Sequence, residues 1–187
     1  DGITSHCYHS TTFKTGSKPE SIFLRPVTQL PLPEPDFTNA SFDPLWDMLN
    51  ISNKEDQMLL IGWMLSCFRT TGPYPALMFQ AQHGSGKTLA TRFVTGLIDP
   101  SASSDRSMPK NERDLAIACQ SSYLLSFDNL SGVRADMADM LCRVSTGAIF
   151  ATRKLYSDSD ETLLHCCNPM VLNGITDLSK RPDLLEL

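Results

Sequence analysis

The sequence has no long hydrophobic run, no clustered cysteine motif and no excess of positive charge. Each of these absences argues against a class of protein. Its longest uncharged apolar run, Met58 to Phe68, is shorter than the roughly 18 residues that a transmembrane helix needs. No basic segment followed by an apolar one occurs near the N-terminus, so we expect neither a secretory signal peptide nor a membrane anchor.

The six cysteines and four histidines are scattered, without the C-x-x-C spacing of zinc sites. Cys166 and Cys167 are adjacent, which suits neither an ordinary disulfide nor a zinc knuckle. We therefore expect reduced, structural thiols in a cytoplasmic protein. The 16 basic and 21 acidic residues give a net charge of −5, which disfavours a nucleic-acid-binding surface over the whole protein but leaves a local basic patch open.

The length of 187 residues favours one domain with an extension. Residues 1–40 are polar and then proline-rich, which predicts an extended arm or linker. Residues 41–72 are expected to form a small helical segment that packs on the core, and residues 73–187 the core itself. The chain starts with Asp1 and not with methionine, so we expect a fragment of a longer protein.

Two helices are predicted in the helical segment, over residues 42–50 and from Ser52 to Phe68. Ser52 and Glu55 have the spacing of a capping box, which would open the second helix. Because this helix is apolar almost all round, we expect it to be largely buried.

After residue 72, short apolar runs alternate with helical patterns. Strands are predicted at residues 74–81, 123–128 and 169–173, helices at 87–97, 112–120 and 133–144, and a hairpin at 148–164. The first of these helices would pack on a sheet through Leu89, Ala90, Phe93, Val94 and Leu97. The alternation predicts an α/β architecture with a mostly parallel sheet.

The most informative motif is Ala81-Gln-His-Gly-Ser-Gly-Lys-Thr88, which has the form of a Walker A phosphate loop with alanine in the first glycine position. A predicted strand precedes it and a predicted helix follows, so its glycines and the helix N–H groups can approach phosphate oxygens. We expect Lys87 to reach the β- and γ-phosphates of ATP and Thr88 to bind Mg²⁺; a chance glycine turn is the alternative. The expected nucleotide-binding residues are Gln82, His83, Gly84, Ser85, Gly86, Lys87, Thr88 and Leu89.

A second motif is the apolar run that ends in Asp128, typical of a Walker B element and of a Mg²⁺ ligand. A simple helix cap is the alternative. Asn129 lies where many ATPases carry a glutamate that polarises the attacking water. Because an amide cannot act as a base, hydrolysis must use another group or be slow. Asn173 ends the last predicted strand and can orient that water, unless Asn173-Gly174 is only a turn.

Together, residues 81–88, 127–131 and 147–156, followed by Asn173 and the segment 181–184, resemble the ATPase domain of phage- and plasmid-type primase–helicases. These are relatives of the superfamily 3 helicases within the AAA+ class. The resemblance covers about residues 55–187 and implies a three-layer P-loop NTPase fold. It also implies a sensor role for Asn173 and a catalytic role for Arg181 near a neighbouring subunit's γ-phosphate.

The resemblance further implies a hexameric ring that surrounds single-stranded DNA. The hairpin over residues 148–164 would point into the central channel, with Arg153, Lys154 and Tyr156 on the DNA. A lid and the true arginine finger would lie beyond residue 187.

We therefore expect the Mg²⁺-dependent ATPase motor domain of a mobile-element DNA replication helicase or primase–helicase. Two alternatives stay open. A non-hydrolysing module that uses ATP to hold an assembly together is favoured by Asn129. A small-molecule P-loop kinase would need an acceptor pocket and a basic lid, and no arginine-rich segment follows the helices.

Overall fold

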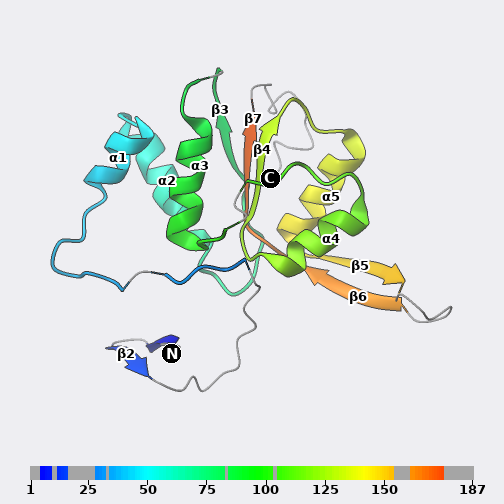
Figure 1. The fold of residues 1–187 in the computed structure, drawn as a ribbon, viewed down its shortest axis with the longest axis horizontal. Coiled ribbons are helices and arrows are strands. Elements are labelled where there is room, and N and C mark those ends of the chain that lie inside the picture. Colours follow the sequence, from blue (N-terminus) through cyan, green and yellow to red (C-terminus); the bar gives the residue numbers. More distant parts are fainter. Residues whose placement is uncertain are drawn as a thin grey trace.

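The computed structural model describes residues 5–9, 12–16, 28–32, 34–82, 84–102, 105–153 and 161–174, leaving aside the side chains of residues 5–16, 152, 153 and 161. Its body is a three-layer α/β arrangement in which helices cover both faces of a parallel sheet (Figure 1).

The sheet consists of β3 (Leu77–Gln80), β7 (Met170–Gly174) and β4 (Leu125–Leu130) in the spatial order β3-β7-β4. Both pairings are parallel, so the parallel sheet predicted from the alternating pattern is confirmed. The last of the described strands, β7, lies in the middle and is buried along its whole length, which is why it reads as an apolar run.

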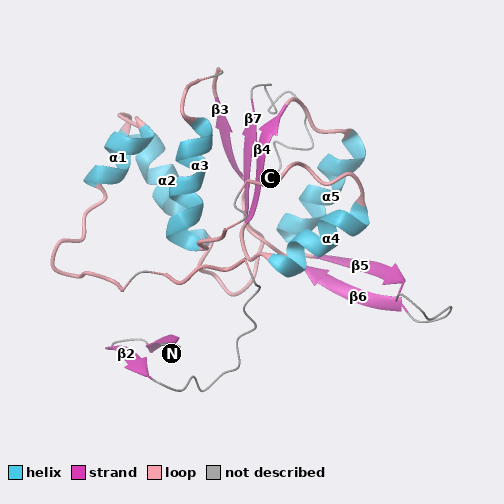
Figure 2. Cartoon of the chain, in the orientation of Figure 1, coloured by secondary structure: helices cyan, strands magenta, loops and turns pink. Residues whose placement is uncertain are grey.

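Helices lie on both faces of this sheet (Figure 2), and a hydrophobic core lies between the helices and the sheet on each face. One packs α4 (Glu112–Ser121) and α5 (Ala135–Thr146) against the sheet. The other packs α1 (Asp43–Leu49), α2 (Lys54–Ser66) and α3 (Lys87–Ile98) against the other face. Met170 and Leu172 of β7 lie in the first core and Val171 lies in the second, because successive side chains of a strand point to opposite faces.

Two expectations about α2 were wrong. Its N-cap is Asn53, whose side chain accepts a hydrogen bond from the Glu55 N–H at 3.0 Å, so Ser52 does not begin a capping box. The helix is also not buried all round: Met58, Leu59 and Leu65 are 65–72% exposed. Only the strip that carries Leu60, Trp63 and Met64 is buried, because one side of the helix meets the body.

The buried face of α3 also differs from the expected one. Leu89 and Leu97 are about half exposed, whereas Thr91, Val94, Thr95 and Ile98 face the sheet. Val94 is buried as predicted, but the apolar pattern identified only part of the packed side, because two threonines also lie on it.

The predicted hairpin is confirmed: β5 (Ala148–Arg153) pairs antiparallel with β6 (Glu161–Cys166) below α4 (Figure 1). An antiparallel pair that was not predicted, β1 (Ser5–His9) with β2 (Thr12–Gly16), lies within the stretch expected to be an extended arm.

Two short contacts extend this framework. The Leu30 N–H donates to the Pro100 carbonyl at 2.8 Å, so the arm runs beside the end of α3. Arg106 forms a parallel bridge with Phe127 at the outer edge of β4.

Cys67, Cys119, Cys142, Cys166 and Cys167 are free thiols. Among the described residues, no helix combines the length and the apolar character needed to cross a bilayer.

Candidate functional site

The described part of the glycine loop, Asp128 and Asn173 lie at the carboxyl edge of the sheet, where the strand arrowheads end in Figure 1. The glycine loop, residues 81–88, connects β3 to α3. Asp128 lies in β4 and Asn173 in β7. Because β7 is the central strand, Asn173 lies between the glycine loop and Asp128.

Thr88 and Asp128 are in direct contact although they are 40 positions apart in the chain. The Thr88 hydroxyl donates to Asp128 Oδ2 at 3.0 Å, and the other carboxylate oxygen accepts from the Asn129 N–H at 2.6 Å. The two residues expected to bind Mg²⁺ are therefore brought together, and the carboxylate is held at both oxygens.

The glycine loop has the backbone that its sequence suggests. Gly84 and Gly86 have φ values of +76° and +82°, a conformation that side chains disfavour, and Gly86 caps the start of α3. Lys87 Nζ donates to the carbonyls of Ala81 and Gln82 at 2.5 and 2.6 Å and lies 3.3 Å from Ser85 Oγ. The lysine therefore closes over the loop and holds its ammonium at the loop's own oxygens.

Asn173 is 1% exposed, and neither atom of its amide has a hydrogen-bond partner among the described residues. The hydroxyls of Thr91 and Ser126 are also buried and lack partners there. Unpaired buried polar groups are costly, so such a group points to a ligand or a water. Ser126 shares a strand face with Asp128, and Thr91 follows Thr88 by one turn of α3.

Sequence reasoning missed Thr91 and Ser126. A signal existed, since Ser126 is the one polar residue inside the apolar run before Asp128. Ser126 stands two positions before Asp128, so it lies on the same face of the strand.

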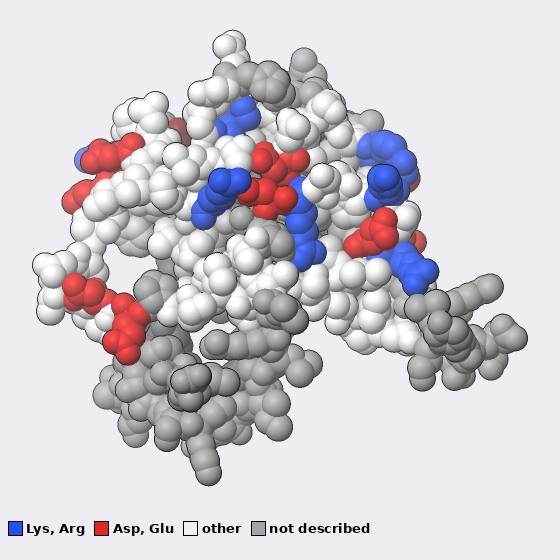
Figure 3. Space-filling model, viewed as in Figure 1, with Lys and Arg blue, Asp and Glu red and all other residues white. Residues whose placement is uncertain are grey.

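Charged side chains surround the loop and β4. Arg92, on α3, pairs with Asp105 at 2.5 Å. The hydrogen bond and charge of Asp105, with a smaller contribution from Asp128, raise the pKa of Arg92. Figure 3 shows basic and acidic side chains interspersed on this side of the molecule.

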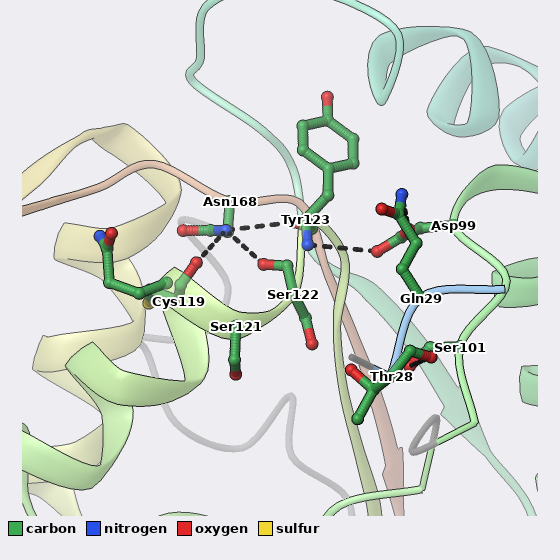
Figure 4. A pocket seen from close by; sticks show the side chains of 10 residues that line it. Thr28, Gln29, Asp99, Ser101, Cys119, Ser121, Ser122, Tyr123 and Asn168 are labelled. Carbon is green, nitrogen blue, oxygen red and sulfur yellow. Dashed lines mark hydrogen bonds between the residues drawn. The ribbon is translucent and has the colours of Figure 1, made fainter. Parts of the chain in front are cut away.

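A separate pocket of about 240 Å³ lies at the opposite, amino edge of the sheet (Figure 4). Its central polar groups are already paired: Asn168 Nδ2 donates to the carbonyls of Cys119, Ser122 and Tyr123 at 3.0–3.2 Å. The Asp99 carboxylate accepts the Tyr123 N–H at 3.1 Å. These bonds join α4 and α3 to the start of β4, so we assign the pocket a structural role.

Several expected site residues cannot be placed. His83, Lys154, Tyr156 and Arg181 lie outside the described residues, and of Arg153 only the backbone at the end of β5 is described. Leu89 lies in the first turn of α3, where its side chain is 53% exposed.

The oxygen ligands at the carboxyl edge, from Thr88 and Asp128, suit Mg²⁺ if other ligands complete its coordination shell. A hydroxyl and one carboxylate supply hard oxygen ligands, and the described residues contain no cluster of three or more acidic, histidine or cysteine side chains that could hold a metal alone. Mg²⁺ commonly uses one or two carboxylates and completes its shell with waters and substrate phosphates. The residues present therefore suit a metal that arrives with a phosphate ligand.

A family model described as "Actinomycete integrative conjugative element replication protein" matches residues 42–187. The chain belongs to this family. No curated protein sequence matches it. This replication-protein match begins just before α1, and it includes the helical segment, the glycine loop and the hairpin.

Two solved structures are similar to this chain. A JCV helicase with an acetamide compound bound matches with a TM-score of 0.51 and 10% identity, over 79% of this chain and 44% of that chain. The apo NrS-1 C-terminal region gives 0.47 and 11%, over 92% of this chain and 40% of that chain. The chain thus spans less than half of the length of these structures. The match with the JCV helicase shows that the chain has a fold similar to that of a helicase domain.

Proposed function

We propose that the chain is an ATP-binding, Mg²⁺-dependent P-loop ATPase domain that drives DNA unwinding by a mobile-element replication protein. The observation that carries this proposal is the contact between Thr88 and Asp128 at the end of two parallel strands, directly beside a loop with two left-handed glycines. A strand, a glycine-rich turn and a helix N-terminus together form an anion site that suits a nucleotide triphosphate.

Each residue then has a distinct task. Backbone N–H groups of residues 84–88 and the Lys87 ammonium bind the β- and γ-phosphates and stabilise the charge that develops during transfer. Thr88 and Asp128 hold Mg²⁺, which neutralises phosphate charge when bound. Asn173 offers a buried donor and acceptor with no described partner, which is what a residue that orients the attacking water requires.

DNA and a ring-shaped assembly are also part of the proposal. The family description and the helicase-like fold support a replication role. The net charge of −5 argues that DNA binding depends on a few cations, and we propose that Arg153 and Lys154 of the hairpin supply them once several copies assemble.

ATP turnover of the purified chain with Mg²⁺, measured with and without single-stranded DNA, tests this function. We expect DNA to stimulate turnover. Asp128→Asn should abolish Mg²⁺-dependent turnover and leave metal-free nucleotide binding largely intact. Asp139→Asn, an exposed carboxylate on α5, is the matched control and should behave as wild type.

Other outcomes select the alternatives. ATP binding without turnover would favour an assembly module, in agreement with the absence of a carboxylate at position 129. Turnover only with a small acceptor would favour a kinase. A chain that binds no nucleotide would contradict all three interpretations.

A further inference from the structure

An irregularity in the sheet lies at the candidate site. Phe127 faces Leu172, and Leu130 faces Gly174, so two residues of β4, Asp128 and Asn129, oppose the single residue between them in β7. One extra residue in one strand is a β-bulge, which bends the strand and redirects a side chain. Asp128 lies in this irregular stretch, and its carboxylate reaches the Thr88 hydroxyl.

The backbone of Asn129 makes this bulge possible. Its φ of +57° lies in the left-handed region, which non-glycine residues seldom adopt and which asparagine tolerates better than most. In this conformation the Asn129 N–H donates to Asp128 Oδ1 at 2.6 Å, while its side chain is exposed. The described bond from Asn129 to the carboxylate therefore comes from its main chain.

Gly174 is an independent sign that the bulge is closely packed. A Cβ at this position would lie 2.7 Å from the Leu130 carbonyl oxygen and 3.2 Å from Leu130 Cβ. Only glycine lets β7 approach β4 so closely just beyond the bulge. Both strands therefore carry a residue that suits the irregular register: Asn129 in β4 and Gly174 in β7.

We propose that Asn129 is a positioning residue, selected for its left-handed backbone, that aims the Asp128 carboxylate at Thr88. It takes no direct part in the chemistry, and asparagine stands there because an acidic base is not the property that this position supplies. This inference rests on the proposed Mg²⁺–nucleotide function.

The test compares substitutions that separate conformation from side-chain chemistry. Asn129→Gly removes the amide and keeps the left-handed backbone accessible, whereas Asn129→Ala removes the amide and disfavours that backbone. Asn50→Ala is the matched control, because Asn50 has a φ of +54° at the end of α1, on another part of the molecule. ATP affinity is measured by calorimetry with and without Mg²⁺, and folding by thermal unfolding.

We expect Asn129→Gly to keep the Mg²⁺-dependent affinity within about twofold and Asn129→Ala to weaken it about five- to tenfold. Metal-free affinity should not change in either variant. Asn50→Ala should lower stability without changing the Mg²⁺ dependence. This pattern would show that the backbone at 129 controls the metal-binding carboxylate.

Three results would overturn the inference. A folded Asn129→Gly that loses Mg²⁺-dependent affinity would show that the amide itself is needed, and this variant decides the matter even where alanine prevents folding. A folded Asn129→Ala with wild-type affinity would show that the left-handed backbone is not controlling. Wild-type protein with no Mg²⁺-dependent nucleotide binding would instead refute the proposed function, and the inference with it.

Discussion

At the scale of single residues, Lys87 is the side chain whose removal should affect nucleotide binding most. Its ammonium lies over the glycine loop, held by the carbonyls of Ala81 and Gln82. Carbonyl oxygens bind a cation less strongly than phosphate oxygens do. The Lys87 ammonium should therefore leave the carbonyls and bind the phosphates of an incoming nucleotide.

We predict that Lys87→Ala weakens ATP binding at least about tenfold, or about 1.4 kcal/mol, in calorimetry. Lys110→Ala, at an exposed position in the loop before α4, is the control and should leave the affinity unchanged. Equal affinities in wild type and Lys87→Ala would refute the assignment of residues 81–88 as a phosphate-binding loop.

At the scale of elements, the close approach of β7 to β4 depends on Gly174. We predict that Gly174→Ala destabilises the fold by about 1–3 kcal/mol, because the added methyl would collide with the Leu130 carbonyl and force the strands apart. Urea unfolding measures this change.

Gly62→Ala provides the opposite control for the same chemical change. Gly62 lies inside α2, and a Cβ there would meet nothing within 4 Å. Alanine should therefore stabilise the helix by about 0.5–1 kcal/mol. If the two substitutions had the same effect, steric fit at the bulge would not be the cause.

At the scale of the whole molecule, buried cysteine thiols make the free energy of unfolding depend on pH in the alkaline range. Burial raises the pKa of the Cys67 thiol to about 12, and burial also raises the pKa values of Cys119 and Cys166. The unfolded chain releases these protons from about pH 9, while the folded chain retains them. The folded state then binds more protons, so the free energy of unfolding must fall as pH rises above about 9.

We predict this decline in urea unfolding between pH 8 and pH 11, with a slope that approaches about 1.4 kcal/mol per pH unit for each such thiol. Cys67→Ala should be less stable at pH 7 because of the cavity that it leaves, but its decline with pH should be shallower. An unchanged slope in this variant would contradict the role of Cys67.

DNA binding also belongs to this scale, because it depends on assembly. We predict that replacing both Arg153 and Lys154 by alanine removes single-stranded DNA binding and leaves ATP affinity unchanged. Wild-type binding should fall steeply with salt, since a few cations per subunit would provide the contacts.

Fluorescence anisotropy of the nucleotide-bound assembly at several salt concentrations measures this effect. If the double variant bound DNA as the wild type does, the hairpin would not be the DNA-contacting element.

The sequence by itself determined the order of the elements from α1 to β7 and the backbone of the glycine loop. Apolar runs and turn residues predicted β3, β4, β7 and the β5–β6 hairpin, because these signals arise from short-range periodicity. The glycines of residues 81–88 predicted a backbone that approaches phosphate, and Gly84 and Gly86 have the left-handed conformation that this requires. These features depend on neighbouring residues only.

Tertiary structure alone decided the register, the bulge and the packed faces. Nothing local in Asp128 and Asn129 shows that both oppose Asn173, because a register exists only between strands far apart in the chain. Likewise, the sides of α2 and α3 that are buried were set by where these helices meet the sheet, so that threonines are buried while Leu59 and Leu89 face solvent. Long-range contacts therefore decide which side of each helix is buried.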